Sequence, residues 1–300
     1  MTQPATTVLY ITGWCRNGST LIGNILNEIP GVCHVGELHY LWMNYLGRGT
    51  NTTCGCGASL ASCPVWGPVL AATAGDVAPA EYAERVLGYR ECVRTRHIRK
   101  VLGYDGQRDQ CLAAYADVLS RTYAAIRAVT GARVIVDGSK YPSEAALLPH
   151  VKGVRPRYLH LVRDPRASAY SWSQPKDYIP SMSVPRSTAY WVGFNLASDA
   201  IRRQYPDHSL FLRYEDFIAD PAAGIDRILK LLGEDPARNP LQGRNVTLNV
   251  NHTVTGNPDR LASGSITVRA SDVDWRSKLP RRSALVATLL SAPVMRRYGY

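Results

Sequence analysis

The sequence predicts an α/β fold built on a single doubly wound parallel sheet of about five strands. Short apolar runs rich in β-branched residues alternate with longer segments whose apolar residues recur at helical spacing. The runs are apolar throughout, as expected for strands that helices cover on both faces. With 300 residues and 45% hydrophobic content, the chain is long enough for one large domain over residues 1–300, with a loose tail at 1–7. The expected strands lie at 8–12, 32–38, 133–137, 157–162 and, with its exit, 209–216.

The first strand leads into a loop, Gly13 to Thr20, and then into an apolar helical segment that Pro30 and Gly31 close. The loop has the P-loop spacing G-x-x-x-x-G-K-[ST], except that Ser19 stands at the lysine position. Backbone N–H groups at such a helix start favour an anion, and Arg16 can supply the missing positive charge. The absent lysine argues against hydrolysis of a nucleoside triphosphate. An ordinary strand-turn-helix remains the alternative interpretation.

A second anion element follows the strand at 157–162. Arg163 leaves the end of that strand, and Pro165 can begin a helix on which Ser171 lies about two turns later. Because the carboxyl ends of parallel strands meet at one edge of a sheet, we expect this element to approach the first loop.

Together the two segments resemble the sulfotransferase family that uses 3′-phosphoadenosine 5′-phosphosulfate (PAPS), including its bacterial, P-loop-like members, over residue 8 to about residue 276. The resemblance implies a 5′-phosphosulfate loop at 16–21 and a 3′-phosphate element at 161–171. It makes Arg260 the counterpart of the family's basic C-terminal segment, although the Arg-Lys-Gly of the cytosolic animal members is absent. Tyr214 is a candidate nucleoside contact or a packing residue. The implied donor-binding residues are Arg16, Asn17, Gly18, Ser19, Thr20, Arg163, Ser171, Tyr214 and Arg260.

The implied chemistry is transfer of a sulfuryl group to a hydroxyl of a small molecule or sugar, without a required metal. Gly36-Glu37-Leu38 resembles the branch of the family that uses a glutamate base, so Glu37 is the candidate base. Lys140 is the candidate for stabilising the leaving phosphate oxygen, with Arg16 assisting. Alternatively, Glu37 pairs with Arg16 or Arg163, and Lys140 is a surface lysine.

Two histidines and one aspartate have secondary roles in this interpretation. His34 and His39 are the runner-up bases, although a histidine in an apolar segment is more often a core residue. Asp137 is expected to orient Lys140 or to cap the turn after its strand.

The charge balance limits the classes of partner. Lys and Arg outnumber Asp and Glu by 35 to 24, giving +11, which suits an anionic ligand. Nucleic acid is compatible with this charge, but no recognition motif for it appears, and we expect no nucleic-acid partner. We also expect no membrane span, no signal peptide and a cytoplasmic location. The competing functions are a P-loop kinase or nucleotidase and a non-catalytic module that binds polyanions or adenine nucleotides. The oligomeric state is not readable.

The region 50–130 is expected to be a cysteine loop followed by helices at 81–102 and 109–129, ended by Gly131, which together form the acceptor side. Cys54, Cys56 and Cys63 cluster in that loop, and a zinc site would need a fourth ligand, for which Cys33 or His34 is near in sequence. The alternative is a glycine-rich loop with buried thiols. Disulfides are less expected in a reducing compartment. A further helix is predicted at 186–204, and the C-terminal segment is less regular.

Overall fold

The computed structural model describes residues 5–176, 179–269 and 275–300. Its centre is a five-stranded sheet in the order β2-β3-β1-β4-β5, with every pairing parallel. The predicted fold class is therefore confirmed. The strand that ends in Lys140 begins one residue later and ends three residues later than predicted. The strands are β1 (Thr6–Thr12), β2 (Val32–Gly36), β3 (Val134–Lys140), β4 (Val154–Val162) and β5 (Ser209–Arg213).

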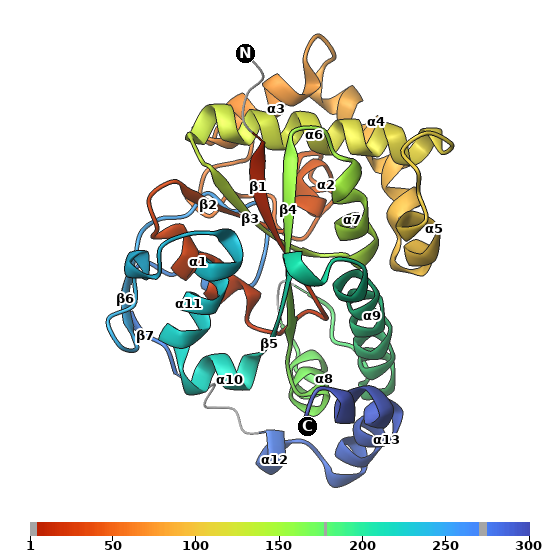
Figure 1. The fold of residues 1–300 in the computed structure, drawn as a ribbon, viewed down its shortest axis with the longest axis vertical. Helices are drawn as coiled ribbons and strands as arrows, with labels where there is room; N and C mark the ends of the chain where they lie inside the picture. Colours follow the sequence, from red (N-terminus) through yellow and green to blue (C-terminus); the bar gives the residue numbers. More distant parts are fainter. Residues whose placement is uncertain (1–4, 177–178, 270–274) are drawn as a thin grey trace.

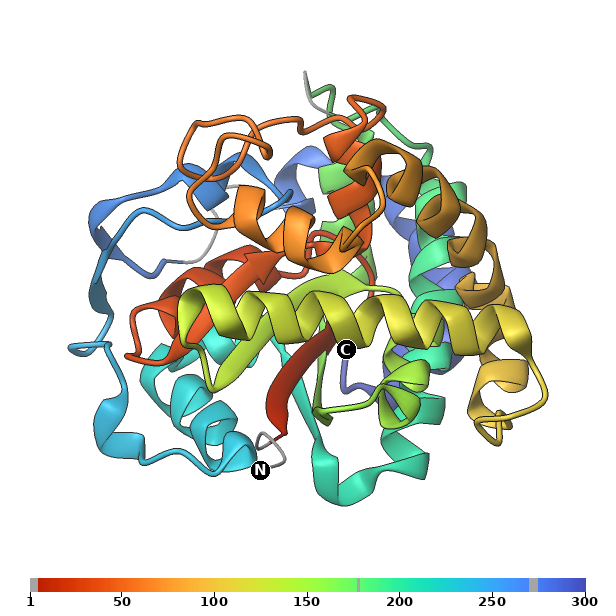
Figure 2. The same ribbon diagram turned by 90° about the horizontal axis from the view of Figure 1, so that it is seen from above.

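Helices cover both faces of this sheet, because alternate side chains of the central strand point to opposite faces. Leu9 and Ile11 pack in the cluster that contains α1 (Ser19–Asn27), α10 (Tyr214–Ala219) and α11 (Pro221–Leu232). Val8 and Tyr10 pack in the cluster on the other face. Figure 1 shows α1 and α11 on one side of the central strands and α7 on the other, and Figure 2 shows α6 running across them. The second face carries α2 (Leu41–Tyr45), α3 (Trp66–Ala74), α4 (Pro79–Tyr89), α5 (Ile98–Leu102), α6 (Gln110–Thr130) and α7 (Pro142–Leu147).

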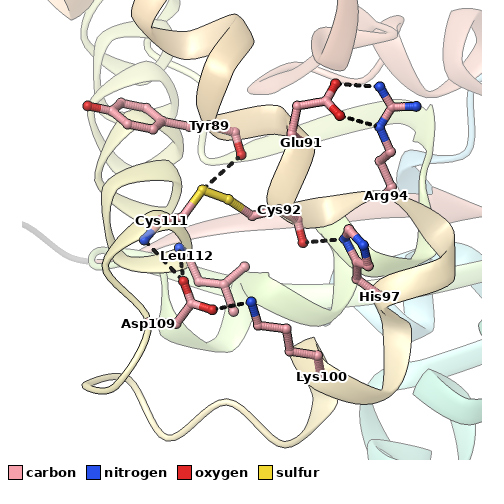
Figure 3. The surroundings of a disulfide bond; sticks show 9 residues. All are labelled: Tyr89, Glu91, Cys92, Arg94, His97, Lys100, Asp109, Cys111 and Leu112. Carbon is pink, nitrogen blue, oxygen red and sulfur yellow. Dashed lines mark hydrogen bonds and ion pairs between the residues drawn. A yellow bond between two sulfur atoms is a disulfide. The ribbon is translucent and has the colours of Figure 1, made fainter.

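The helical insertion differs from its prediction in one place. The expected helix at 81–102 breaks after Tyr89, and Arg94 is extended with ψ 145° before α5 begins. A disulfide joins Cys92 of this break to Cys111 at the start of α6, where the Asp109 carboxylate accepts from two backbone N–H groups as an N-cap (Figure 3). This disulfide was not predicted from the sequence.

A third apolar cluster joins α8 (Pro165–Ser173), α9 (Val184–Gln204) and α13 (Arg281–Arg297), beside the short α12 (Trp275–Lys278). The helix predicted at 186–204 is confirmed as α9. The C-terminal segment, which we expected to be less regular, contains the helix α13. Its buried residues include the small Ala287 and Ser291 while Leu285 and Leu289 are exposed, so the sequence shows no clear apolar face there. A small antiparallel pair, β6 (Asn245–Leu248) and β7 (Gly264–Thr267), packs on the α1 face. In the described residues, the helices are too short or too polar to cross a membrane.

Candidate active site

A cavity of about 730 Å³ opens at the carboxyl edge of the sheet. Each of the five strands delivers one lining residue to it at or just beyond its carboxyl end: Arg16, Glu37, Lys140, Arg163 and Tyr214. In the strand order, the connections from the adjacent β1 and β4 leave in opposite directions, so the cavity lies at the switch point where ligands of doubly wound sheets bind.

The loop after β1 is built to present a helix start to this cavity. Gly18 precedes α1 with φ +91°, and Gly18, Ser19 and Thr20 all line the cavity. The Asn17 side chain is buried, and its amide donates to the Leu161 carbonyl at 2.8 Å, so it anchors the loop to β4 without lining the cavity. The positive end of the α1 dipole therefore faces the cavity and favours an anion there.

A second positively charged wall comes from the segment after β4. The Arg163 guanidinium donates to the Arg16 carbonyl at 3.1 Å and lies 4.6 Å over the Tyr214 ring. Its buried Nε has no hydrogen-bond partner among the described residues. Ser171 also lines the cavity, and its backbone carbonyl and hydroxyl oxygens both accept from the Lys176 ammonium, at 3.0 and 3.1 Å.

Lys176 is a lining residue that the sequence analysis missed. Burial and then the charges of Arg16 and Arg163 lower the pKa of Lys176 to about 8, so three cationic side chains crowd one wall. Such crowding is unfavourable without a ligand and is relieved by an anion. The sequence indicated this position only weakly. Pro175 ends α8 soon after Ser171, so Lys176, which follows Pro175, stays close to the predicted 3′-phosphate element.

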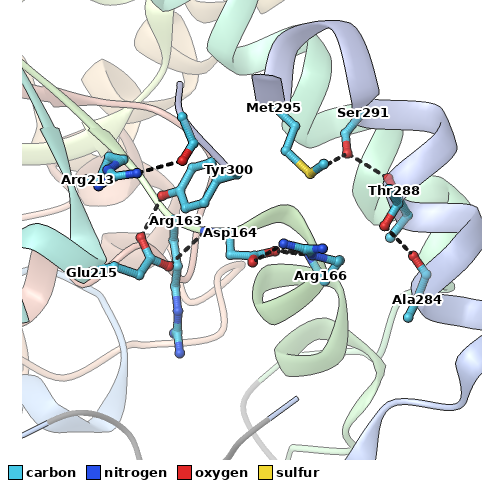
Figure 4. Close-up of polar contacts among 12 residues, drawn as sticks. Arg163, Asp164, Arg166, Arg213, Glu215, Ala284, Thr288, Ser291, Met295 and Tyr300 are labelled. Atoms are coloured by element: carbon cyan, nitrogen blue, oxygen red, sulfur yellow. Dashed lines mark hydrogen bonds and ion pairs between the residues drawn. The ribbon is translucent and has the colours of Figure 1, made fainter. Parts of the chain in front are cut away.

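The backbone that carries Arg163 is fixed from the far end of the chain. The Asp164 backbone N–H donates to Glu215 at 3.0 Å, and the Tyr300 hydroxyl donates to the same carboxylate at 2.6 Å. Arg213 donates to the Gly299 carbonyl at 2.8 Å. Figure 4 shows that the Arg163 guanidinium points away from this network. The last residue of the chain thus holds the strand end from which Arg163 projects.

Glu37 and Lys140 form an ion pair at the opposite wall, with Lys140 Nζ 2.6 Å from Glu37 Oε1. The same ammonium donates to the Gly138 carbonyl at 2.7 Å. Lys140 is buried, with φ +70°, whereas the Glu37 side chain is 20% exposed. Burial acts to lower the pKa of Lys140, but Glu37, followed by Cys15 and Asp137, outweighs burial in total and the pKa is raised. Lys140 is therefore charged, and the partner of Glu37 is Lys140 rather than Arg16 or Arg163.

Asp137 caps the turn that precedes Lys140. Its carboxylate accepts from the Ser139 backbone N–H at 2.9 Å and from the Tyr123 hydroxyl at 2.8 Å. The capping role predicted for Asp137 is confirmed.

The other predicted site residues are turned elsewhere. His34 is buried against Gly23, and burial lowers its pKa to about 3. His39 lies behind the wall, where its Nδ1 is 2.7 Å from Glu144. Arg260 is buried and donates to the Thr253 carbonyl at 3.4 Å. Among the described residues that line the cavity, none of these three occurs, so the structure does not bring them to the site.

The remaining wall is aromatic. The Trp14 ring stacks on Trp172 with centroids 5.5 Å apart and lies 4.9 Å from Phe194. The Tyr141 ring lies 5.9 Å from Phe194, and the Tyr141 and Tyr40 hydroxyls are hydrogen-bonded at 2.8 Å. The buried indole N–H groups of Trp14 and Trp172 have no hydrogen-bond partner in the described part of the chain. This wall suits a largely apolar ligand with a few polar groups.

Little of the range 50–130, which we expected to form the acceptor side, lines the cavity. From the range 50–130, which is described throughout, Thr50 and Asn51 alone line the cavity. The helices of that range bury their apolar faces on the sheet instead, because they supply much of the cluster on that face.

A group of potential metal ligands lies outside the cavity. Cys54, Cys56 and Cys63 are joined by His252, and their ligand atoms lie within 4.8 Å of one another. The expected fourth positions are wrong: Cys33 lies near Thr130 instead, and His34 packs on Gly23.

Comparison with known proteins bears on this geometry. The model of the sulfotransferase family matches residues 70–237, which is more than half of the chain. The chain belongs to the sulfotransferase family. Comparison of this sulfotransferase with curated proteins finds no match.

The first of three similar solved structures agrees on the fold of this sulfotransferase. The sulfotransferase domain from the Synechococcus PCC 7002 olefin synthase is 21% identical, with 97% of this chain and 95% of that one covered and a TM-score of 0.53. A sulfotransferase from Alicyclobacillus acidocaldarius is 13% identical, with 98% and 96% covered and a TM-score of 0.41. Sulfotransferase STF9 from Mycobacterium avium is 14% identical, with 78% and 67% covered and a TM-score of 0.46.

Proposed function

We propose that this sulfotransferase moves the sulfuryl group of PAPS to a hydroxyl of a small molecule or sugar. The observation that carries the proposal is the convergence of all five strand ends on one cavity, with the α1 start and Arg16 as one group of anion-binding elements and Arg163 with Lys176 as a second. A donor phosphorylated at both ends of its nucleoside needs two such anion sites, whereas a monophosphate needs one.

The α1 start and Arg16 are assigned to the 5′-phosphosulfate, because backbone N–H groups and a guanidinium stabilise negative oxygens. Arg163, Ser171 and Lys176 are assigned to the 3′-phosphate. The crowded cations and the buried, unpartnered Arg163 Nε support this assignment. Tyr214 packs flat under Arg163 and against Gly18, and is assigned to the nucleoside between the two anion sites.

In the proposed reaction the acceptor oxygen attacks sulfur while the bond from sulfur to the 5′-phosphate oxygen breaks. The hydroxyl proton goes to Glu37, and the leaving phosphate oxygen retains the bonding electrons. Lys140 Nζ uses two of its three donors on Glu37 and Gly138, which leaves the third for that oxygen. Glu37 Oε2 accepts no hydrogen bond from the described residues and is the oxygen we assign as base.

The kinase alternative is less well supported, since Ser19 occupies the position of the P-loop lysine and no carboxylate cluster stands ready for Mg²⁺ among the described lining residues. A polyanion-binding module does not account for the ion pair between Glu37 and the buried Lys140.

The proposal is tested by calorimetric titration of 3′-phosphoadenosine 5′-phosphate, AMP and ATP into the protein. The bisphosphate should bind at least tenfold more tightly than AMP, and Arg163→Ala should weaken it by about 1.5–3 kcal/mol, which is the worth of a charge-assisted hydrogen bond. Arg155→Ala is the matched control, since Arg155 lies outside the cavity at the other end of β4. Equal binding of AMP and the bisphosphate would refute the two-site assignment. Incubation with labelled PAPS and a metabolite extract, followed by mass spectrometry, tests the transfer itself.

A further inference from the structure

We propose that Cys54, Cys56, Cys63 and His252 form a structural zinc site that joins the two loops bordering the active-site cavity. The three cysteines come from one loop, and the histidine lies 189 residues after Cys63. This inference is independent of the donor and acceptor proposed above.

Four of the six distances between the ligand atoms are close to those around a tetrahedral ion, and all six lie within 4.8 Å. Zn–S bonds of about 2.3 Å and Zn–N bonds of about 2.0 Å at tetrahedral angles require about 3.8 Å between sulfurs and about 3.5 Å from sulfur to nitrogen. In the structure, the Cys63 sulfur lies 3.5 Å from that of Cys54 and 3.9 Å from that of Cys56. The His252 Nδ1 lies 3.3 Å from the Cys63 sulfur and 3.7 Å from the Cys54 sulfur.

The same distances argue against a disulfide in this cluster. A disulfide brings two sulfurs to about 2.0 Å, and all three thiols are free here, unlike the Cys92–Cys111 pair. Four protein ligands also fill a tetrahedral zinc, which leaves no position for water or substrate. The composition therefore indicates a structural ion rather than a catalytic one.

Hydrogen bonds from the surroundings hold three of the four ligands in place. The Cys56 backbone N–H donates to the Cys54 sulfur at 3.5 Å, and the Val65 backbone N–H donates to the Cys63 sulfur at 3.4 Å. The Trp66 indole donates to the His252 carbonyl at 2.9 Å, which fixes the backbone of that ligand. Such bonds to the ligands are the usual second layer of a metal site.

Gly55 shows how closely the two segments approach. A Cβ there would lie 2.4 Å from the Asn251 carbonyl oxygen, so glycine alone lets the cysteine loop sit against the segment of His252. The Gly55 N–H then donates to the Thr253 carbonyl at 3.0 Å.

The charge of the surroundings fits as well. Three thiolates around one Zn²⁺ leave one net negative charge, and a buried negative group needs a positive neighbour. Arg260 is buried with 4% exposure, makes no ion pair with a carboxylate in the described residues and lies near Cys54. Its guanidinium donates to the carbonyl of Thr253, the residue that follows His252. Arg260, which the sequence placed at the donor, is therefore the counter-charge of this site.

The site would fix both borders of the cavity. Arg48–Asn51 line the cavity just before Cys54, and Thr255–Asp259 line it just after His252. A zinc ion that joins Cys54 to His252 limits the separation of these two segments. None of the four ligands is among the described lining residues, so the ion acts through positioning.

The test measures zinc by mass spectrometry in the full chain, purified without chelators from zinc-supplemented cells. We expect about one zinc per chain, and less than roughly a tenth of that in Cys63→Ser and in His252→Ala. Cys33→Ser and His208→Ala, which change residues outside the cluster, should keep the metal, and His252→Cys should retain it as a four-thiolate site.

If the ligand variants do not fold, the wild-type protein still decides the matter. Replacing the metal with Co²⁺ should give the absorption bands of tetrahedral thiolate coordination, and thiol titration should show the three cluster cysteines protected until the metal is removed. Wild-type protein without zinc, a disulfide within the cluster, or equal metal loss in Cys33→Ser would each overturn the proposal.

Discussion

Replacing Glu37 with Gln tests the catalytic assignment most directly. Gln keeps the shape of the side chain and an oxygen for Lys140, but it cannot accept the acceptor's proton. We expect turnover to fall by roughly two to four powers of ten, the usual worth of a general base, with donor affinity almost unchanged. The charge-assisted hydrogen bond of 2.6 Å becomes a neutral one, so the unfolding free energy should fall by about 1–2 kcal/mol.

The substitution also changes Lys140. Burial acts to lower the pKa of this lysine, and Glu37 is the first of the groups that raise it. Without the carboxylate the pKa of Lys140 must drop, so the lysine loses its proton at a lower pH than in the wild type. The residual activity of the variant should therefore decline toward alkaline pH, where the wild-type lysine is still charged.

The assay is steady-state turnover against pH, with the bisphosphate affinity measured separately by calorimetry. Glu81→Gln, on the exposed face of α4, is the matched control and should behave as wild type. A phenol that ionises easily should depend less on Glu37 than an alkyl alcohol does, whereas Lys140→Ala should slow both. Wild-type turnover in Glu37→Gln would refute the assignment and place the base elsewhere.

Three further predictions concern binding and stability. The pKa of Lys176 is lowered to about 8 by burial and the neighbouring arginines, so bisphosphate affinity should fall as pH rises through 8. Calorimetry should show a weaker dependence of this affinity on pH for Lys176→Gln, and an equally steep dependence would contradict the prediction. Gly18→Ala should weaken bisphosphate binding. It should also lower the unfolding free energy by more than the about 1–2 kcal/mol of left-handed strain, because its Cβ would lie 2.5 Å from the Tyr214 ring. Gly153→Ala, which has a left-handed φ but open space around its Cβ, should lower the unfolding free energy by the strain alone, as measured by denaturant unfolding. Reduction of the Cys92–Cys111 disulfide, which closes a loop over a separation of 19 residues, should lower stability by about 3 kcal/mol in the same assay, and an unchanged midpoint would show that the bond is not formed in solution.

The sequence by itself determined the parts of this sulfotransferase that depend on local order. Strand, glycine-bearing loop and helix follow each other directly at residues 6–27, so their pattern is visible without the fold. Arg163 and Lys140 were predicted at the cavity because each stands where an apolar strand stops, and all carboxyl ends of a parallel sheet share one edge.

Tertiary structure decided the pairings between distant segments. Nothing near Lys140 in the sequence identifies Glu37 as its partner, since the pair forms when β2 and β3 become neighbours. The close approach that Gly55 permits brings the segment of His252 against the cysteine loop, and the buried Arg260 donates to the Thr253 carbonyl there rather than lining the cavity. The helices of 50–130 pack on the sheet rather than line the cavity, because burial of their apolar faces lowers the free energy more than exposure at an open cavity does. Local order is encoded by neighbours in the chain, whereas these contacts depend on which surfaces pack together.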